Sequence, residues 1–323
     1  MKRNIAIIAG GDSAEFEISM QTSKHIFNTL DKNLYQVYLA VFRGQNWKVN
    51  LDDKEYNIDK NDFSITVADQ KIKFDFAYIA IHGTPGENGI LQGYLSIMNI
   101  PHSTCDVLSS SLSFNKHACN SYLKTLGYKF AKSVLLKKGE KYDCNTIKDK
   151  VGLPCFVKPN ADGSSFGISK VLEFKELENA ILKAFNEGKE VIIEEYIEGL
   201  EVTSGLVKTS KEEIIFPITE IIPKNDFFDF EAKYDPKMAE EITPARISPE
   251  LTLEIQNLSS EIYDALKCKG IVRVDYIIKD DKPYILEANT IPGMTPNSFI
   301  PKQVKAMGRE LGDILTLVIE DQF

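Results

Sequence analysis

The chain has 323 residues, of which 43% are hydrophobic, and this length and composition suit a folded protein of two or three domains. Its formal net charge of −9 argues against a broad nucleic-acid interface, which requires a basic surface. Five scattered cysteines without metal-ligand spacing, and no apolar run long enough for a signal peptide or a membrane span, indicate a reduced, cytoplasmic protein.

The first third of the chain has the pattern of an open α/β sheet. Residues 4–9 form a short apolar strand that ends at two glycines, and Ser13 is a good N-cap for a helix that follows. Further strands at 35–42 and 76–81 surround a polar excursion at 47–73. We therefore expect an N-terminal α/β domain over residues 1–104.

Polar side chains follow two of these strands. Glu15 lies in the first turn of the predicted helix, where the helix dipole favours a carboxylate with or without a ligand. His82 and Glu87, in the segment HGTPGENG, follow the strand at 76–81 and so lie at the carboxyl edge of the sheet, where such sheets bind ligands. A structural turn with a capping histidine is an equal alternative.

A second region, over residues 105–188, begins with a serine-rich turn and a predicted helix at about 112–126. The loop NADGSSFG at 160–167 lies between two predicted strands and offers small residues and backbone N–H groups that can bind phosphate oxygens. Lys158, just upstream, adds a positive charge. The loop lacks the GK[ST] signature of a Walker loop, and an ordinary hairpin with a surface lysine is the simpler alternative. A helix is predicted at 175–187.

The third region, over residues 189–323, has a mixed α+β pattern with a helix at 249–267. The strand VIIEEYIEGLE ends in glutamates, among them Glu194 and Glu201, that suit either an adenosine pocket or a solvated acidic turn. The segment FFDFEAKYDP at 227–236 suits either a loop that closes over a ligand, with Lys233 and Tyr234 turned inward, or a connector with aromatic anchors.

The end of the chain predicts a polar hairpin. IVRVDYII and YILEAN flank the turn segment KDDKP, and strand alternation puts Arg273 and Asp275 on one face. A hairpin centred near Asp281 places Asp275 opposite Glu287 and Arg273 opposite Asn289. Two carboxylates and an amide suit magnesium that is shared with substrate phosphates, and the arginine can hold a developing anion.

Taken together and in this order, the motifs resemble the D-alanine–D-alanine ligases of the ATP-grasp superfamily. The resemblance covers nearly the whole chain and is carried by GGDSAEFEIS, HGTPGENGILQGYL, SFNKHA, VKPNADGSSFGISKV, IEEYIEGLEVT, FEAKYDP, VRVDY and LEANTIPGMTPNSFIP. It implies an ATP-grasp fold behind the N-terminal α/β domain. It further implies that ATP and D-alanine are substrates, that two magnesium or manganese ions bind, and that the chain forms a homodimer.

The resemblance also implies residue roles at matching positions. The nucleotide-binding positions are Lys116, Lys158, Ser165, Glu194, Glu201 and Lys233, and the metal ligands are Asp275, Glu287 and Asn289. The catalytic positions are Glu15, Ser164, Tyr234, Arg273 and Gly293, and the substrate-binding positions are His82 and Ser298. In this assignment Glu15 receives the ammonium of the first D-alanine, oriented by Ser164 and Tyr234. Arg273 and the Gly293 N–H stabilise an oxyanion.

Two other functions stay open. The chain could be another ATP-grasp carboxylate–amine ligase, or one that uses D-lactate as the second substrate. It could also be a nucleotide-binding regulatory protein with an inactive ligase fold, although such a protein would be expected to lose the metal carboxylates or Arg273.

Overall fold

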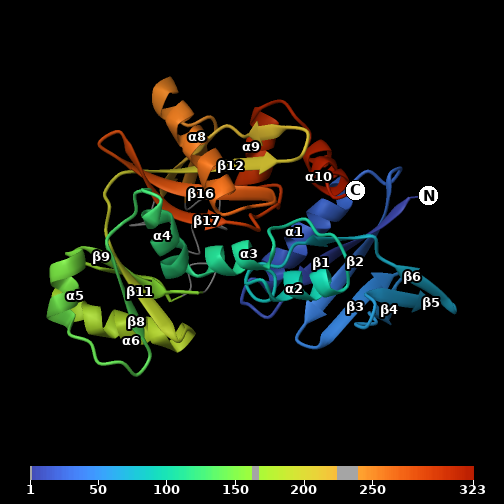
Figure 1. The fold of residues 1–323 in the computed structure, drawn as a ribbon, viewed down its shortest axis with the longest axis horizontal. Coiled ribbons are helices and arrows are strands. Elements are labelled where there is room, and N and C mark those ends of the chain that lie inside the picture. The colour runs from blue at the N-terminus through green and yellow to red at the C-terminus, as the bar shows by residue number, and fades with distance from the viewer. Residues whose placement is uncertain (1, 162–166, 224–238) are drawn as a thin grey trace.

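The computed structural model describes residues 2–161, 167–223 and 239–323. Among these residues the three largest sheets have five, four and six strands. Figure 1 shows one large sheet in each third of the chain, with the C-terminal helix returning to the N-terminal third. Arg3 near the start of the chain pairs with Glu320 near its end at 2.6 Å, which fastens the two ends together.

The N-terminal third forms the five-stranded sheet, in the order β4-β3-β2-β1-β7, with β1 parallel to both β2 and β7. Its elements are β1 Arg3–Gly10, α1 Phe16–Thr29, β2 Tyr35–Arg43, β3 Asn46–Leu51, β4 Lys54–Asn57, β7 Phe76–Ile79 and α2 Ile90–Ile97, with a separate hairpin of β5 Ser64–Val67 and β6 Gln70–Lys73. The strands predicted at 4–9, 35–42 and 76–81 are confirmed as β1, β2 and β7. The polar excursion at 47–73 contains the strands β3 to β6.

The predicted N-cap of the first helix is wrong. Helix α1 begins at Phe16 with Glu15 in the N-cap position. Ser13 instead donates its hydroxyl proton to the main-chain oxygen of His82 at 2.8 Å and accepts the N–H of Glu15 at 3.3 Å. It therefore ties the turn after β1 to the turn after β7, so that Glu15 and His82 lie on neighbouring turns.

The single helix predicted at 112–126 is also wrong, because two helices occupy this stretch. They are α3 Val107–Phe114 and α4 Lys116–Thr125. Between them Asn115 adopts an extended conformation, with ψ of 99°, and its side chain accepts the N–H of Ala118. This N-cap satisfies a donor at the start of α4 and begins a new helix there.

The central sheet is antiparallel, in the order β10-β9-β11-β8. Its elements are β8 Ser133–Lys137, α5 Cys144–Val151, β9 Cys155–Pro159, β10 Ser169–Val171, α6 Leu177–Glu187 and β11 Glu190–Glu195, with a 3-10 turn at Phe174–Glu176. Helices α5 and α6 share one hydrophobic cluster with the strands, so both cover the same face of the sheet. The helix predicted at 175–187 is confirmed as α6 with the short turn before it.

The C-terminal sheet has the order β15-β14-β12-β16-β17, and β13 pairs with β12. Its elements are β12 Leu200–Lys208, β13 Glu213–Ile215, β14 Thr219–Pro223, β15 Ala239–Ile242, α8 Pro249–Ala265, β16 Gly270–Lys279, β17 Lys282–Asn289, α9 Phe299–Ala306 and α10 Leu311–Glu320. The helix predicted at 249–267 is confirmed as α8. No helix in the described ranges combines the length and apolarity needed to cross a bilayer.

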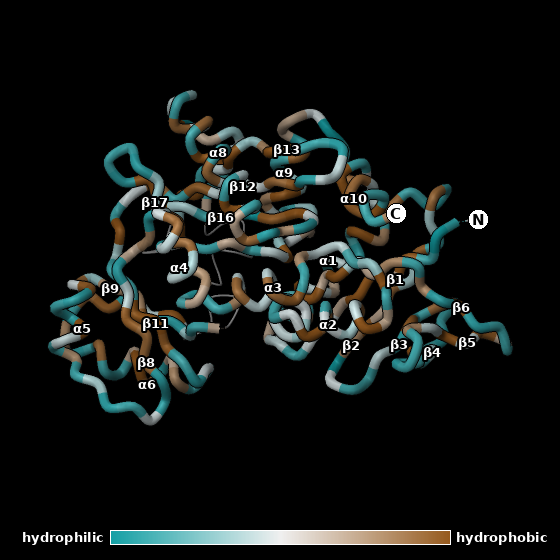
Figure 2. The backbone as a smooth tube through the Cα atoms, in the orientation of Figure 1, coloured by the Kyte–Doolittle hydropathy of each residue, from teal (hydrophilic) through white to brown (hydrophobic). Residues whose placement is uncertain are grey.

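One hydrophobic cluster joins the two ends of the chain. It contains side chains of β1, α1 and β7 together with side chains of β12, β16, α9 and α10. Figure 2 shows the corresponding hydrophobic segments around β1 and α10. Because this core is continuous, the N-terminal sheet is held against the C-terminal sheet.

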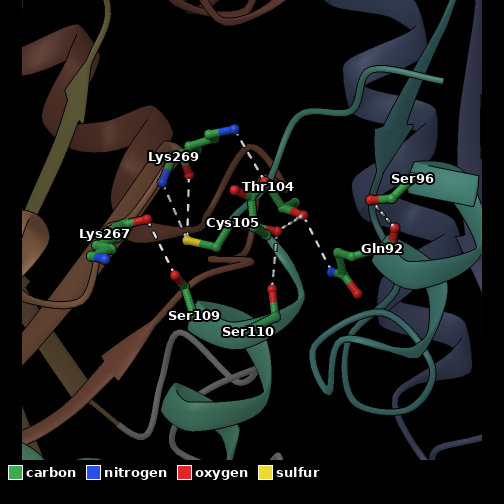
Figure 3. Close-up of polar contacts among 9 residues, drawn as sticks. Gln92, Ser96, Thr104, Cys105, Ser109, Ser110, Lys267 and Lys269 are labelled. Carbon is green, nitrogen blue, oxygen red and sulfur yellow. Dashed lines mark hydrogen bonds and ion pairs between the residues drawn. The ribbon is translucent and has the colours of Figure 1, made fainter. Parts of the chain in front are cut away.

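Polar contacts join the segment 103–109, at the boundary between the first and second regions, to the turn before β16 (Figure 3). The Lys269 N–H lies 3.3 Å from the sulfur of Cys105, and the Ser109 hydroxyl donates to the main-chain oxygen of Lys267 at 3.2 Å. At Gly270 an added Cβ would lie 2.0 Å from the main-chain oxygen of Ser103. Backbone therefore meets backbone at this point, where only glycine fits.

Candidate active site

A cavity of about 470 Å³ lies where the three sheets meet. Twelve of the predicted site residues line it, from all three thirds of the chain: Glu15, His82, Lys116, Lys158, Glu194, Glu201, Arg273, Asp275, Glu287, Asn289, Gly293 and Ser298. The other four, Ser164, Ser165, Lys233 and Tyr234, lie outside the described residues. The structure therefore brings together every predicted site residue that it describes.

The predicted register of the C-terminal hairpin is confirmed at the cavity. Asp275 pairs with Glu287, and Arg273 pairs with Asn289. The turn itself consists of Asp280 and Asp281, both at positive φ, and the register shifts next to Asp275. This irregularity carries the polar side chains of β17 into line with those of β16.

Arg273 and Asp275 bind each other through two hydrogen bonds. The arginine Nε and Nη2 donate to the two carboxylate oxygens at 2.8 and 2.7 Å. The Thr203 hydroxyl, from the neighbouring strand β12, donates to Asp275 Oδ1 at 2.5 Å. Asp275 is only 7% exposed, so these three donors replace hydrogen bonds to water that the carboxylate loses on burial.

The hairpin side chains fit a hard cation. Asp275, Glu287 and Asn289 present carboxylate and amide oxygens to one cavity wall, which are the donors that magnesium prefers. Among the described residues no group of three or more His, Cys, Asp and Glu side chains is arranged as a metal site. A set with two carboxylates leaves coordination positions for water and phosphate, as magnesium usually requires.

The two predicted phosphate lysines bind carboxylates on different sheets. Lys158 Nζ, on β9, lies 2.6 Å from Glu194 Oε2, and Lys116 Nζ, on α4, lies 3.9 Å from Glu287 Oε2. Burial acts to lower the pKa of Lys158, but the charge and hydrogen bond of Glu194, together with the charges of Glu287 and Glu201, outweigh it and hold that pKa above its ordinary value. Lys158 is therefore positively charged at neutral pH in the cavity wall.

The N-terminal wall carries two perturbed groups. His82 is buried, its Nε2 lies 3.2 Å from the Thr22 hydroxyl, and burial lowers its pKa to about 4. Glu87 accepts the Gly83 N–H at 2.8 Å, while burial and the charge of Glu15 raise its pKa to about 7. At neutral pH His82 is thus uncharged, and Glu87 is present in both its protonated and its ionised form.

The segment after the hairpin completes the cavity. Ser298 stands at the N-cap position of α9, and its Oγ accepts the N–H of Thr295 at 3.0 Å. A Cβ added at Gly293 would lie 2.8 Å from this oxygen. A glycine at 293 therefore lets the backbone approach the Ser298 hydroxyl closely.

Sequence reasoning missed several residues that shape the cavity. Thr203 holds Asp275, and Asn120 on α4 donates to Glu194 Oε1 at 3.2 Å. Asn160 is the first residue of the loop NADGSSFG, and no role was predicted for its side chain. No pattern in one sequence marks these residues, because each acts through a partner more than 30 positions away in the chain.

Known proteins match this chain along its whole length. A family model described as the D-ala D-ala ligase N-terminus matches residues 4–105, and the model for the C-terminus of the same ligases matches residues 122–320. The chain belongs to the D-alanine–D-alanine ligase family. A D-alanine–D-alanine ligase from Azobacteroides pseudotrichonymphae is 53% identical over 98% of this chain and 99% of its own length.

Solved structures of the family agree with the fold. The VanG D-Ala:D-Ser ligase from Enterococcus faecalis has a TM-score of 0.89 and 31% identity, with 100% of both chains covered. The D-alanine–D-alanine ligase from Bacillus anthracis complexed with ATP has a TM-score of 0.79 and 30% identity, covering 99% of this chain and 97% of that one. The expected ATP-grasp fold with an N-terminal α/β sheet domain is thereby confirmed.

Proposed function

We propose that this chain is an ATP- and magnesium-dependent ligase that joins two D-alanines for peptidoglycan precursor synthesis. The observation that carries the proposal is the convergence of lysines, carboxylates and Arg273 on one cavity in a member of this ligase family. A carboxylate and a triphosphate must approach each other in this reaction. Cationic side chains reduce their repulsion.

In the first step a carboxylate oxygen of one D-alanine bonds to the γ-phosphorus as the bond to ADP breaks, which gives an acylphosphate. Lys116 and Lys158 bind the phosphate oxygens, and Glu194 and Glu201 contact the adenine and ribose. Glu15, buried at the start of α1, receives the ammonium of this D-alanine. We assign Ser165 and Lys233 to the nucleotide as well.

In the second step the amine nitrogen of the other D-alanine bonds to the carbonyl carbon, and phosphate leaves. Arg273 and the Gly293 N–H stabilise the oxyanion that develops, and the Ser298 hydroxyl contacts the second carboxylate. Ser164 and Tyr234 orient Glu15, and the uncharged His82 side chain lines the same part of the cavity. The attacking ammonium must first lose a proton, and we assign the Ser164 and Tyr234 pair to this proton transfer.

Asp275, Glu287 and Asn289 would hold the magnesium or manganese ions, two in number, which neutralise phosphate charge when bound. Thr203 and Arg273 orient Asp275 in the cavity wall. These hydrogen bonds support a metal site in which the Asp275 carboxylate is already in position before the nucleotide binds.

The sheets support a proposal for the domain organisation. We propose an N-terminal domain over 1–104 and a central region that starts at 105. Strand β11 pairs with β8 and β9, so we place the end of the central region after β11 rather than at residue 188. A cytoplasmic location, from the ATP requirement, and a homodimer are further parts of the proposal.

The test is incubation with ATP, magnesium and D-alanine, followed by ADP assay and mass spectrometry of the product. D-alanyl-D-alanine should form in equal amount to ADP, and L-alanine should support neither. ADP release without an amino acid, or with L-alanine alone, would contradict the proposal.

The similarity to a D-Ala:D-Ser ligase makes the second substrate a separate question. A panel of D-alanine, D-serine and D-lactate at several pH values answers it. An amine acceptor must lose a proton and so gains rate as pH rises, whereas a hydroxy acid has no ammonium to deprotonate. Preference for D-serine or D-lactate at neutral pH would reassign the acceptor.

A further inference from the structure

A fully buried asparagine joins the central sheet to the helix that carries Lys116. Asn160 directly follows β9 and is 0% exposed. Its main-chain oxygen accepts the N–H of Lys116 at 3.0 Å, and its side-chain oxygen accepts the N–H of His117 at 2.8 Å. The first N–H groups of a helix have no acceptor within the helix. Asn160 supplies two of those acceptors to α4.

The side-chain nitrogen and the main-chain N–H of Asn160 also have hydrogen-bond partners. Asn160 Nδ2 donates to Asn115 Oδ1 at 2.9 Å and to Glu190 Oε2 at 2.8 Å, and its main-chain N–H donates to the main-chain oxygen of Glu190 at 3.0 Å. Asn115 Oδ1 also accepts the N–H of Ala118, so it presents an oxygen to Asn160. The amide therefore has a defined orientation, and each of its polar atoms has a partner.

These contacts determine the spacing of two cations. In the part of the chain that the structure describes, the lysines lining the cavity are Lys116 and Lys158. Lys158 lies two residues before Asn160 on β9, whereas Lys116 lies on α4. The distance between the two ammonium groups therefore depends on how α4 sits on the end of β9, and Asn160 bonds directly to the start of α4.

We propose that Asn160 is a positioning residue for the nucleotide phosphates. It fixes Lys116 relative to Lys158 so that both ammonium groups reach one phosphate chain. This role rests on the proposed function, which places phosphates at these lysines. Asn160 is not among the described residues that line the cavity, so it acts through the main chain of α4.

The sharpest variant is Asn160→Asp, which keeps the size of the side chain and an acceptor for the His117 N–H. It removes both side-chain N–H donors and brings a carboxylate to the 2.8 Å contact with Glu190. We expect the dissociation constant for ADP, measured by calorimetry, and the KM for ATP to rise at least tenfold. The KM for D-alanine should change by less than twofold.

Two further variants separate positioning from general destabilisation. Glu190→Gln in the Asn160→Asp background offers an amide donor to the new carboxylate, and it should recover at least threefold of the lost ADP affinity. Asp143→Ala is the matched control, because Asp143 caps α5 on the same sheet by accepting the N–H groups of Asn145 and Thr146. It should lower thermal stability and leave ADP affinity within twofold.

The proposal is overturned if folded Asn160→Asp protein binds ADP within twofold of the unaltered chain, or if Asp143→Ala weakens ADP binding equally. If Asn160→Asp yields no folded protein, Asn115→Ala decides, because it removes one acceptor of the Asn160 amide; unchanged ADP affinity then overturns the proposal. A chain that binds ADP in this Asn160-dependent way but makes no D-alanyl-D-alanine would instead contradict the proposed function alone.

Discussion

Replacement of Glu87 by glutamine tests the electrostatics of the N-terminal cavity wall. Burial, followed by the charges of Glu15 and Glu287, raises the pKa of Glu87 from 4.5 to about 7, even though the Gly83 N–H and Lys116 oppose the rise. The folded protein thus holds the Glu87 proton more tightly than the unfolded chain. The stability that this adds is fully present below pH 4.5 and is lost as pH rises through about 7.

A pKa difference of this size corresponds to about 3 kcal/mol. Glutamine keeps an acceptor for the Gly83 N–H and does not titrate. Urea unfolding of both proteins from pH 5 to 8 should therefore show the original chain losing about 2.5 kcal/mol relative to Glu87→Gln as pH rises, because part of the loss already lies below pH 5. His82, whose pKa is lowered to about 4, also contributes to the free energy of unfolding, and this contribution is lost as pH falls. Because both proteins contain His82, its contribution cancels in the comparison. A difference that does not vary with pH would refute the reasoning.

Three other substitutions have expected outcomes. Glu287→Ala should abolish ADP production while the circular dichroism spectrum stays unchanged, and persistent turnover would show that the metal assignment is wrong. Thr203→Val removes the hydroxyl donor to Asp275 and should lower the free energy of unfolding by about 2 kcal/mol, which Thr203→Ser should largely restore; equal losses in both would exclude the hydrogen bond as the cause. Gly270→Ala puts a Cβ 2.0 Å from the main-chain oxygen of Ser103, at a residue with φ +69°. This substitution should lower the free energy of unfolding by about 3 kcal/mol. Its control, Gly308→Ala at φ +74° with no atom within 4 Å, should cost about 1 kcal/mol, and a similar loss in both would contradict the proposed clash.

The hairpin at the cavity was predictable because its signals are local. Strand alternation and the turn segment KDDKP were enough to pair Asp275 with Glu287 and Arg273 with Asn289. The turn actually lies at Asp280 and Asp281, and the register shift next to Asp275 restores the expected pairing nearer the cavity. Such an irregularity has no signature in the residue types alone.

The helix prediction at 112–126 failed for a physical reason. One helix was expected to run through Asn115, but that residue caps α4 and accepts a hydrogen bond from Asn160, which lies 45 positions later. A long-range contact of this kind overrides local helix propensity. The same reason hid Thr203, because its hydroxyl gains a role only when β12 pairs with β16.

The most direct measurement of the central claim follows an oxygen atom. D-alanine labelled with ¹⁸O in its carboxylate is incubated with ATP, magnesium and the enzyme, and the released phosphate is analysed by mass spectrometry. Attack of the carboxylate on the γ-phosphate predicts one labelled oxygen in each phosphate. Unlabelled phosphate, formed together with ADP and dipeptide, would contradict the account.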